Sequence, residues 1–140
     1  MIQRPQSLFL ALAVIFAGSL FALDYPFESL AAGAYDAFAP AFGMFCGAIA
    51  AGAALAVFQF RNRVSQRRSI AILAGLALVL IALVGGGYAV AGDLAALSRS
   101  GRLDGYASLA GPVVILILLL LARRGVTSDI ETVRSMDRLR

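Results

Sequence analysis

Few side chains in this sequence can do chemistry. The chain has no histidine and no lysine, and its single cysteine, Cys46, lies inside an apolar stretch. Without histidine there is no imidazole for proton transfer or for binding haem or zinc, and without lysine there is no Schiff base or P-loop lysine. A single cysteine forms no disulfide within the chain. We therefore expect a protein that is not an enzyme and that holds no metal or other cofactor.

Carboxylates are the remaining groups with catalytic or transport chemistry, and they avoid the apolar stretches of the chain. Asp24, Asp93 and Asp104 lie only at the edges of these stretches. Transport that is coupled to ions or protons ordinarily uses an ionisable side chain within the membrane. The sequence disfavours such a mechanism but leaves open a pathway for a neutral solute or a lipid.

Four apolar stretches would have to position any functional group. They cover about residues 7–23, 37–60, 69–91 and 105–122, and each is near the roughly 20 residues that a helix needs to cross a membrane. Hydrophobic residues make up 61% of the chain and charged residues only 14%. The sequence thus predicts an all-α, polytopic membrane protein, with a four-helix transmembrane bundle formed by residues 1–126. The first stretch follows Arg4 as in a signal peptide, but it lacks a clear cleavage site, so we expect it to be retained.

The positions of the arginines predict how the chain is oriented. All 12 basic residues are arginine, and most lie in the N-terminal segment, in residues 61–68 and after residue 122. In a bundle of four spans these segments share one side, and only Arg99 and Arg102 fall on the other. The positive-inside rule then places both termini in the cytoplasm. Because topology accounts for the net charge of +4, we do not expect nucleic acid as a partner.

The second apolar stretch contains a seam of small residues. Gly43 and Gly47 form a GxxxG motif that Ala51 continues four residues later. Small residues let two helix backbones approach closely, and the resulting van der Waals contact favours association in lipid. The sequence predicts a helix-packing seam here, either inside the chain's own bundle or against another protein.

The last residues, 127–140, predict a short cytoplasmic amphipathic helix. Ser128 and Glu131 have the spacing of a capping box, which would start the helix at this point. One face of this helix would either dock on a partner protein or rest on anionic lipid headgroups. The predicted docking face combines an apolar stripe with two arginines: Ile130, Val133, Met136, Arg134 and Arg138.

The two ends of the chain carry its most specific motifs. The chain begins Met1-Ile2-Gln3-Arg4-x-Gln6-Ser7-Leu8 and ends Val133-Arg134-Ser135-x-Asp137-Arg138-Leu139-Arg140. Together with the length and the four spans, these motifs resemble a family of small bacterial four-helix integral membrane proteins known only as a domain of unknown function. The chain departs from that pattern at Pro5, where an aliphatic residue is expected, and at Met136, where a small one is. The resemblance implies a bacterial location, which with the predicted spans means the cytoplasmic (inner) membrane, and no known activity, substrate or cofactor.

These features favour a non-enzymatic accessory, assembly or regulatory subunit. Its expected partners are membrane lipids and another membrane protein or a second copy of itself. The alternative is a small oligomeric transporter or channel for a neutral solute or a lipid. A membrane enzyme is the least favoured class, because its chemistry would depend on carboxylates at the edges of the spans.

Overall fold

The described part of the chain is almost entirely helical. The computed structural model describes residues 5–20, 38–91 and 103–137. Within these ranges lie four α-helices and one short 3-10 helix: α1 (Pro5–Ser19), α3 (Phe38–Phe58), η2 (Gln59–Arg61), α4 (Arg63–Ala91) and α6 (Leu103–Asp137). The predicted all-α fold is confirmed.

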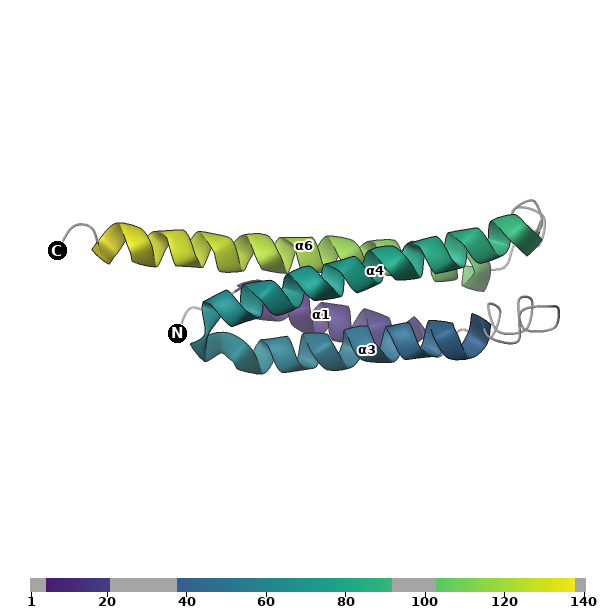
Figure 1. The fold of residues 1–140 in the computed structure, drawn as a ribbon, viewed down its shortest axis with the longest axis horizontal. Helices are drawn as coiled ribbons and strands as arrows, with labels where there is room; N and C mark the ends of the chain where they lie inside the picture. The colour runs from purple at the N-terminus through teal and green to yellow at the C-terminus, as the bar shows by residue number, and fades with distance from the viewer. Residues whose placement is uncertain (1–4, 21–37, 92–102, 138–140) are drawn as a thin grey trace.

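The four α-helices pack as a bundle in which each helix lies against two neighbours. α1 contacts α3 and α6, and α4 contacts the same two helices from the opposite corner of the bundle. Figure 1 shows that η2, the first turn of α1 and the last turn of α6 lie toward the same end. We call this end, which carries most of the described arginines, the arginine-rich end.

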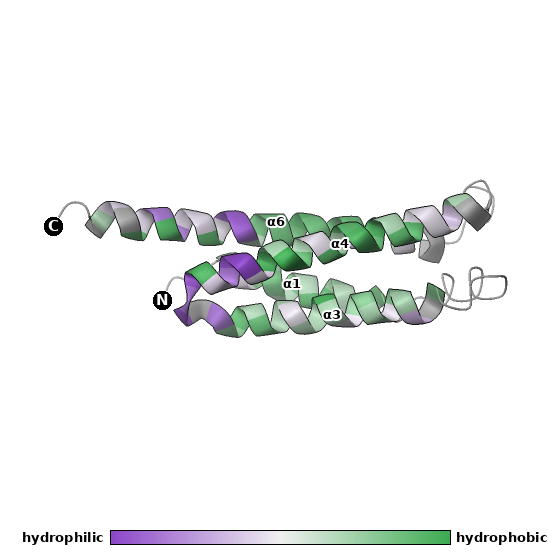
Figure 2. Cartoon of the chain, in the orientation of Figure 1, coloured by the Kyte–Doolittle hydropathy of each residue, from purple (hydrophilic) through white to green (hydrophobic). Residues whose placement is uncertain are grey.

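Three of the helices are long and apolar enough to cross a membrane, namely α3, α4 and α6. Helix α1 is also apolar but has 15 residues, which at 1.5 Å per residue span about 22 Å against about 30 Å of hydrocarbon. Hydrophobic residues cover the middle of all four helices, and hydrophilic ones gather at the arginine-rich end (Figure 2). The fold is therefore that of a helical protein suited to a membrane.

Small residues let the helices approach closely. A Cβ placed on Gly52 of α3 would lie 2.5 Å from Cδ2 of Leu73 in α4. A Cβ on Gly111 of α6 would lie 2.5 Å from Cδ2 of Leu20, which directly follows α1. The two leucines thus fill space that a side chain at either glycine would need, and this is the kind of contact that packs helices in lipid.

The connection between α3 and α4 is shorter than predicted. We expected residues 61–68 to be a loop and a helix to begin at residue 69, but α4 begins at Arg63. Asn62 caps it: its Oδ1 accepts a hydrogen bond from the Ser65 amide at 3.1 Å, and its carbonyl accepts one from the Gln66 amide at 2.9 Å. The prediction was wrong because a run of arginines is hydrophilic yet has good helix propensity.

The last helix also differs from the prediction. Helix α6 continues without a break across the expected boundary between residues 126 and 127 and ends at Asp137. The hydroxyls of Thr127 and Thr132 donate to the carbonyls of Arg123 and Ser128, which is the i to i−4 pattern of a helix interior. Ser128 is therefore inside a helix and does not cap the start of one.

Candidate functional site

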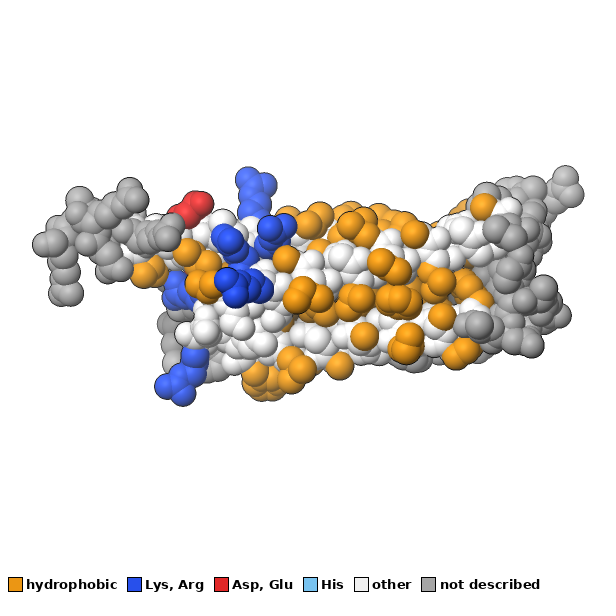
Figure 3. All heavy atoms as spheres, in the orientation of Figure 1, with side chains coloured by type: hydrophobic (Ala, Val, Ile, Leu, Met, Phe, Trp, Pro, Cys, Tyr) orange, Lys and Arg blue, Asp and Glu red, His pale blue; other side chains and the backbone are white. Residues whose placement is uncertain are grey.

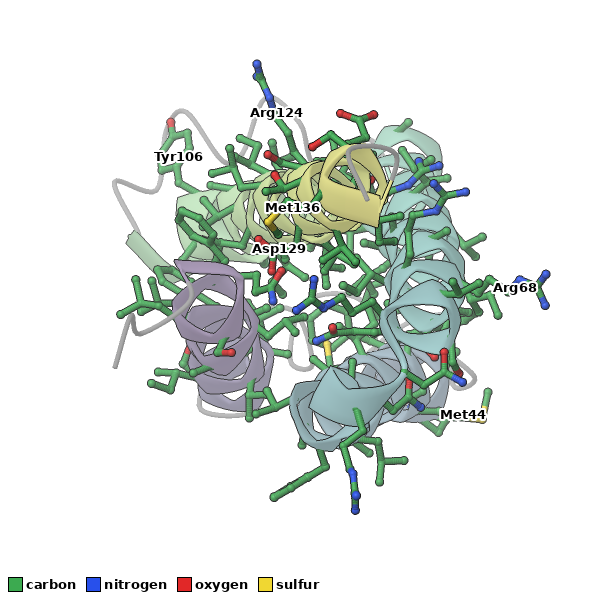
Figure 4. All side chains as sticks on the ribbon, turned by 90° about the vertical axis from the view of Figure 1, so that its left-hand side faces the viewer. Met44, Arg68, Tyr106, Arg124, Asp129 and Met136 are labelled. Atoms are coloured by element: carbon green, nitrogen blue, oxygen red, sulfur yellow. The ribbon has the colours of Figure 1, made fainter. Side chains whose placement is uncertain are left out.

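Four polar side chains lie at the arginine-rich end of the bundle, on three different helices. They are Gln6 of α1, Arg63 and Gln66 of α4, and Asp129 of α6, and we call them the polar junction. Gln6 and Gln66 are only 3% and 1% exposed. Figure 4 looks at this end of the molecule and shows Asp129 on the inward side of α6.

Hydrogen bonds connect three of the helices through Asp129. The side-chain amide of Gln6 donates from Nε2 to Oδ2 of Asp129 at 3.2 Å. From α4, Arg63 donates from Nη1 to the backbone carbonyl of Asp129, also at 3.2 Å. A carboxylate oxygen has only acceptor sites, so the amide N–H of Gln6 is a suitable donor to it. The junction thus fixes the position of α6 relative to both α1 and α4.

Gln66 brings the fourth helix into the junction. Its Nε2 donates to the carbonyl of Ala56, near the end of α3, at 3.0 Å. The Oε1 atoms of Gln6 and Gln66 are buried and accept no hydrogen bond from the residues that the structure describes. A buried acceptor without a donor costs about 1–3 kcal/mol. Within the described residues, these two oxygens are therefore the unsatisfied acceptors of the polar junction.

The polar junction is a set of hydrogen-bonding groups that includes one carboxylate. Residues 5–20, 38–91 and 103–137 contain no group of three histidine, cysteine or acidic side chains placed to hold a metal ion. Amide groups, a guanidinium and one carboxylate can recognise polar groups and hold helices in position. The arrangement suits a structural lock at the point where the chain leaves its apolar region.

The predicted helix-packing seam does not lie in the core of the bundle. Gly43 and Gly47 are half-buried, and Ala51 is exposed. The buried side of α3 is formed by larger residues and other alanines: Phe42, Cys46, Ile49, Ala53 and Ala56. The seam thus lies along the outer side of the bundle, where another protein or a second copy can reach it. Its role in packing stays a prediction.

The predicted docking face divides into two parts. Ile130 is half-buried and packs against the core, so it belongs to the bundle. Val133 and Met136 are 41% and 58% exposed. Arg134 lies in α6, but its side chain is not among those that the structure describes. Arg138 lies outside the described residues. The structure therefore leaves Val133 and Met136 as the uncovered apolar part of this face.

The sequence prediction missed the polar junction, although a signal for it exists. Gln6 precedes the buried Leu10 by four residues, and Gln66 precedes the buried Ile70 by four. Each glutamine therefore continues the buried line of its helix by one turn. Asp129 follows the buried Val126 by three residues in the same way. A search for polar residues that extend an apolar face would have found all three.

Comparison with known proteins places the chain in a family. No curated protein and no solved structure matches it. The domain of unknown function DUF4293 matches residues 2–139, nearly the whole chain. This match confirms the resemblance to an uncharacterised family that the two terminal motifs indicated. The polar junction, the outer seam and the uncovered end of α6 are thus features of a chain that belongs to the DUF4293 family.

Proposed function

We propose that this protein is a non-enzymatic accessory or assembly subunit of a bacterial cytoplasmic membrane, with four spans and both termini in the cytoplasm. In this proposal it binds another membrane protein through the end of α6. The observation that carries the proposal is that α6 extends past the other three helices at the arginine-rich end (Figure 1).

The uncovered end of α6 continues the side that is buried within the bundle. Val133 and Met136 follow Asp129 by four and seven residues, so all three lie on one side of the helix. Figure 4 shows Met136 on the same side of α6 as Asp129. Inside the bundle this side packs against other helices, but at Val133 and Met136 it is exposed. An apolar helix face that extends beyond the helices that cover it elsewhere is suited to pack against a helix of a partner protein.

The structure decides how this proposal should be tested. Truncation after Val126 would also remove Asp129 and Ile130, which hold the bundle together. Substitution of the exposed pair, Val133→Ser with Met136→Ser, leaves those contacts in place. The matched control is Glu131→Ala with Ser135→Ala, because these two exposed residues lie on the opposite side of the same turns.

The experiment compares what copurifies with the full chain, the face variant and the control variant. Each carries an N-terminal tag and is solubilised gently from native membranes. We expect a stoichiometric protein partner with the wild type and the control, and its loss with the face variant. If all three chains retain the same partner, or if none has a stoichiometric partner, docking through α6 is wrong. The transporter or channel for a neutral solute or a lipid then becomes the function to test.

A further inference from the structure

Exposed arginines on α4 and α6 play no part in the proposed function. Figure 3 shows arginine side chains gathered over these two helices, at the boundary between the apolar surface and the arginine-rich end. Arg67 and Arg68 of α4 and Arg123 and Arg124 of α6 are all exposed. Their directions around the bundle decide which of them can act together.

Arg67 lies on the side of α4 that faces α6. It follows Arg63 by four residues and therefore lies one turn further along the same side. Arg63 reaches the Asp129 carbonyl of α6, which shows that this side faces α6. The next residue, Arg68, points away from the bundle in Figure 4.

Arg123 lies on the edge of α6 that faces α4. It follows the buried Leu119 by four residues and precedes the half-buried Ile130 by seven, so it continues their side. The opposite edge of α6 is occupied by α1, since Gly125 approaches Gln6 of that helix. Arg124 points away from the bundle in Figure 4. The line along which α4 and α6 pack against each other is therefore flanked by Arg67 and Arg123, and we call the surface above this line the groove.

The two arginines also lie at nearly the same level along the bundle. Measured from the contact between Arg63 and Asp129, Arg67 is four residues along α4 and Arg123 is six residues back along α6. At 1.5 Å per residue these are about 6 and 9 Å in the same direction, because the helices are antiparallel. The chain has no acidic residue between Phe38 and Ala91, so neither α3 nor α4 offers a carboxylate to these arginines. Two guanidinium groups on either side of one groove favour an anion between them.

We propose that Arg67 and Arg123 bind the phosphate of an anionic phospholipid from the surrounding membrane. The arginine side chains of α4 and α6 lie at the boundary of the apolar surface (Figure 3), where the headgroup of a lipid would lie. Toward the middle of the bundle, Leu120 of α6 is exposed about one turn from Arg123, and Leu78 of α4 is exposed about three turns from Arg67. Both leucines offer contact to acyl chains. A soluble phosphate or an acidic peptide would make no use of this apolar surface.

The test measures lipid binding to the full-length protein by native mass spectrometry with added phosphatidylglycerol or phosphatidylcholine. The groove variant is Arg67→Gln with Arg123→Gln. Its control, Arg68→Gln with Arg124→Gln, removes the same charge from the two arginines that point away. We expect the wild type and the control to prefer phosphatidylglycerol, and the groove variant to bind it about tenfold more weakly or worse.

Three results would overturn the proposal. One is equal weakening of phosphatidylglycerol binding by both double variants, which would mean that the lipid responds only to the total positive charge of this end. Another is unchanged binding by the groove variant, with its helicity intact by circular dichroism. The third is displacement of the lipid by equimolar inorganic phosphate, which would assign the groove to a soluble anion. If the groove variant loses helicity, Arg67→Lys with Arg123→Lys replaces it, and this variant must keep the preference for phosphatidylglycerol.

Discussion

At Gly52, a missing side chain sets how closely α3 and α4 can pack. A Cβ there would lie 2.5 Å from Cδ2 of Leu73, so a larger residue must displace that leucine. We expect Gly52→Val to destabilise the protein by about 1–3 kcal/mol, the usual cost of overpacking a core. The measurement is the thermal unfolding midpoint of the purified protein in detergent, followed by circular dichroism.

Gly75 of α4 provides the matched control for this substitution. It is exposed, and nothing lies within 4 Å of a Cβ placed on it. Gly75→Val should leave the midpoint unchanged or raise it, because glycine is a poor helix former in the middle of a helix. Equal losses at both positions would mean that the contact with Leu73 does not govern the response, because the Gly75 variant makes no such contact.

The carboxylate of Asp129 should contribute measurably to stability, because it accepts the Gln6 amide across the bundle. We expect Asp129→Ala to lower the free energy of unfolding by about 1–2 kcal/mol, since hydrogen bonds to charged groups are the stronger ones but this side chain is only half-buried. Glu131→Ala removes the same charge from an exposed position and should change it by less than about 0.5 kcal/mol. Denaturant titration in detergent measures both, and equal effects would show that the Gln6 contact contributes nothing.

At the scale of the helices, hydropathy predicted the apolar elements well and their ends poorly. The predicted span 37–60 agrees closely with α3, because uncharged apolar residues fill it from end to end. Helices α4 and α6 are longer than predicted, because both continue into charged segments that hydropathy assigned to loops or to a separate tail. Hydropathy reports where lipid can be, whereas a helix ends where its capping and packing end.

The sequence marks Gln6, Gln66 and Asp129 as polar residues on apolar faces, but it does not show which of them meet in the polar junction. Gln6 and Asp129 are separated by more than a hundred residues and meet only because α1 and α6 are neighbours in the bundle. Nothing local in the sequence states that two helices so far apart will pack together. The exposed pair Val133 and Met136 could be predicted as one face, but the separation of Ile130 from that face required the positions of the neighbouring helices.

Replacement of Ser128 tests whether α6 is continuous, because a continuous helix and a separate tail helix predict changes in stability of opposite sign. If this exposed serine capped the start of a tail helix, Ser128→Ala would cost about 1 kcal/mol. Within a continuous helix, alanine is the better helix former, so the same substitution should be neutral or stabilising by up to about 0.5 kcal/mol. The structure predicts the second outcome, and the free energy of unfolding in detergent measures it. A clear loss of stability would show that a helix begins at Ser128.

At the scale of the whole molecule, the proposed topology makes opposite predictions for the two ends of the bundle. Tyr106 and Ser135 are both exposed and both lie in α6, near its first and last turns. With Cys46 replaced by alanine, Tyr106→Cys and Ser135→Cys each provide a single thiol for labelling.

A membrane-impermeant thiol reagent added to spheroplasts should label Tyr106→Cys, because this end faces away from the cytoplasm when the arginine-rich end faces inward. It should label Ser135→Cys only after the membrane is permeabilised. The reverse pattern would invert the orientation, and with it the compartment in which a partner could meet the end of α6. Labelling of both thiols on intact spheroplasts would mean that α6 does not separate the two compartments or that the chain inserts both ways. Because Val133 and Met136 lie within one turn of Ser135, the same experiment decides whether the docking face is presented to the cytoplasm.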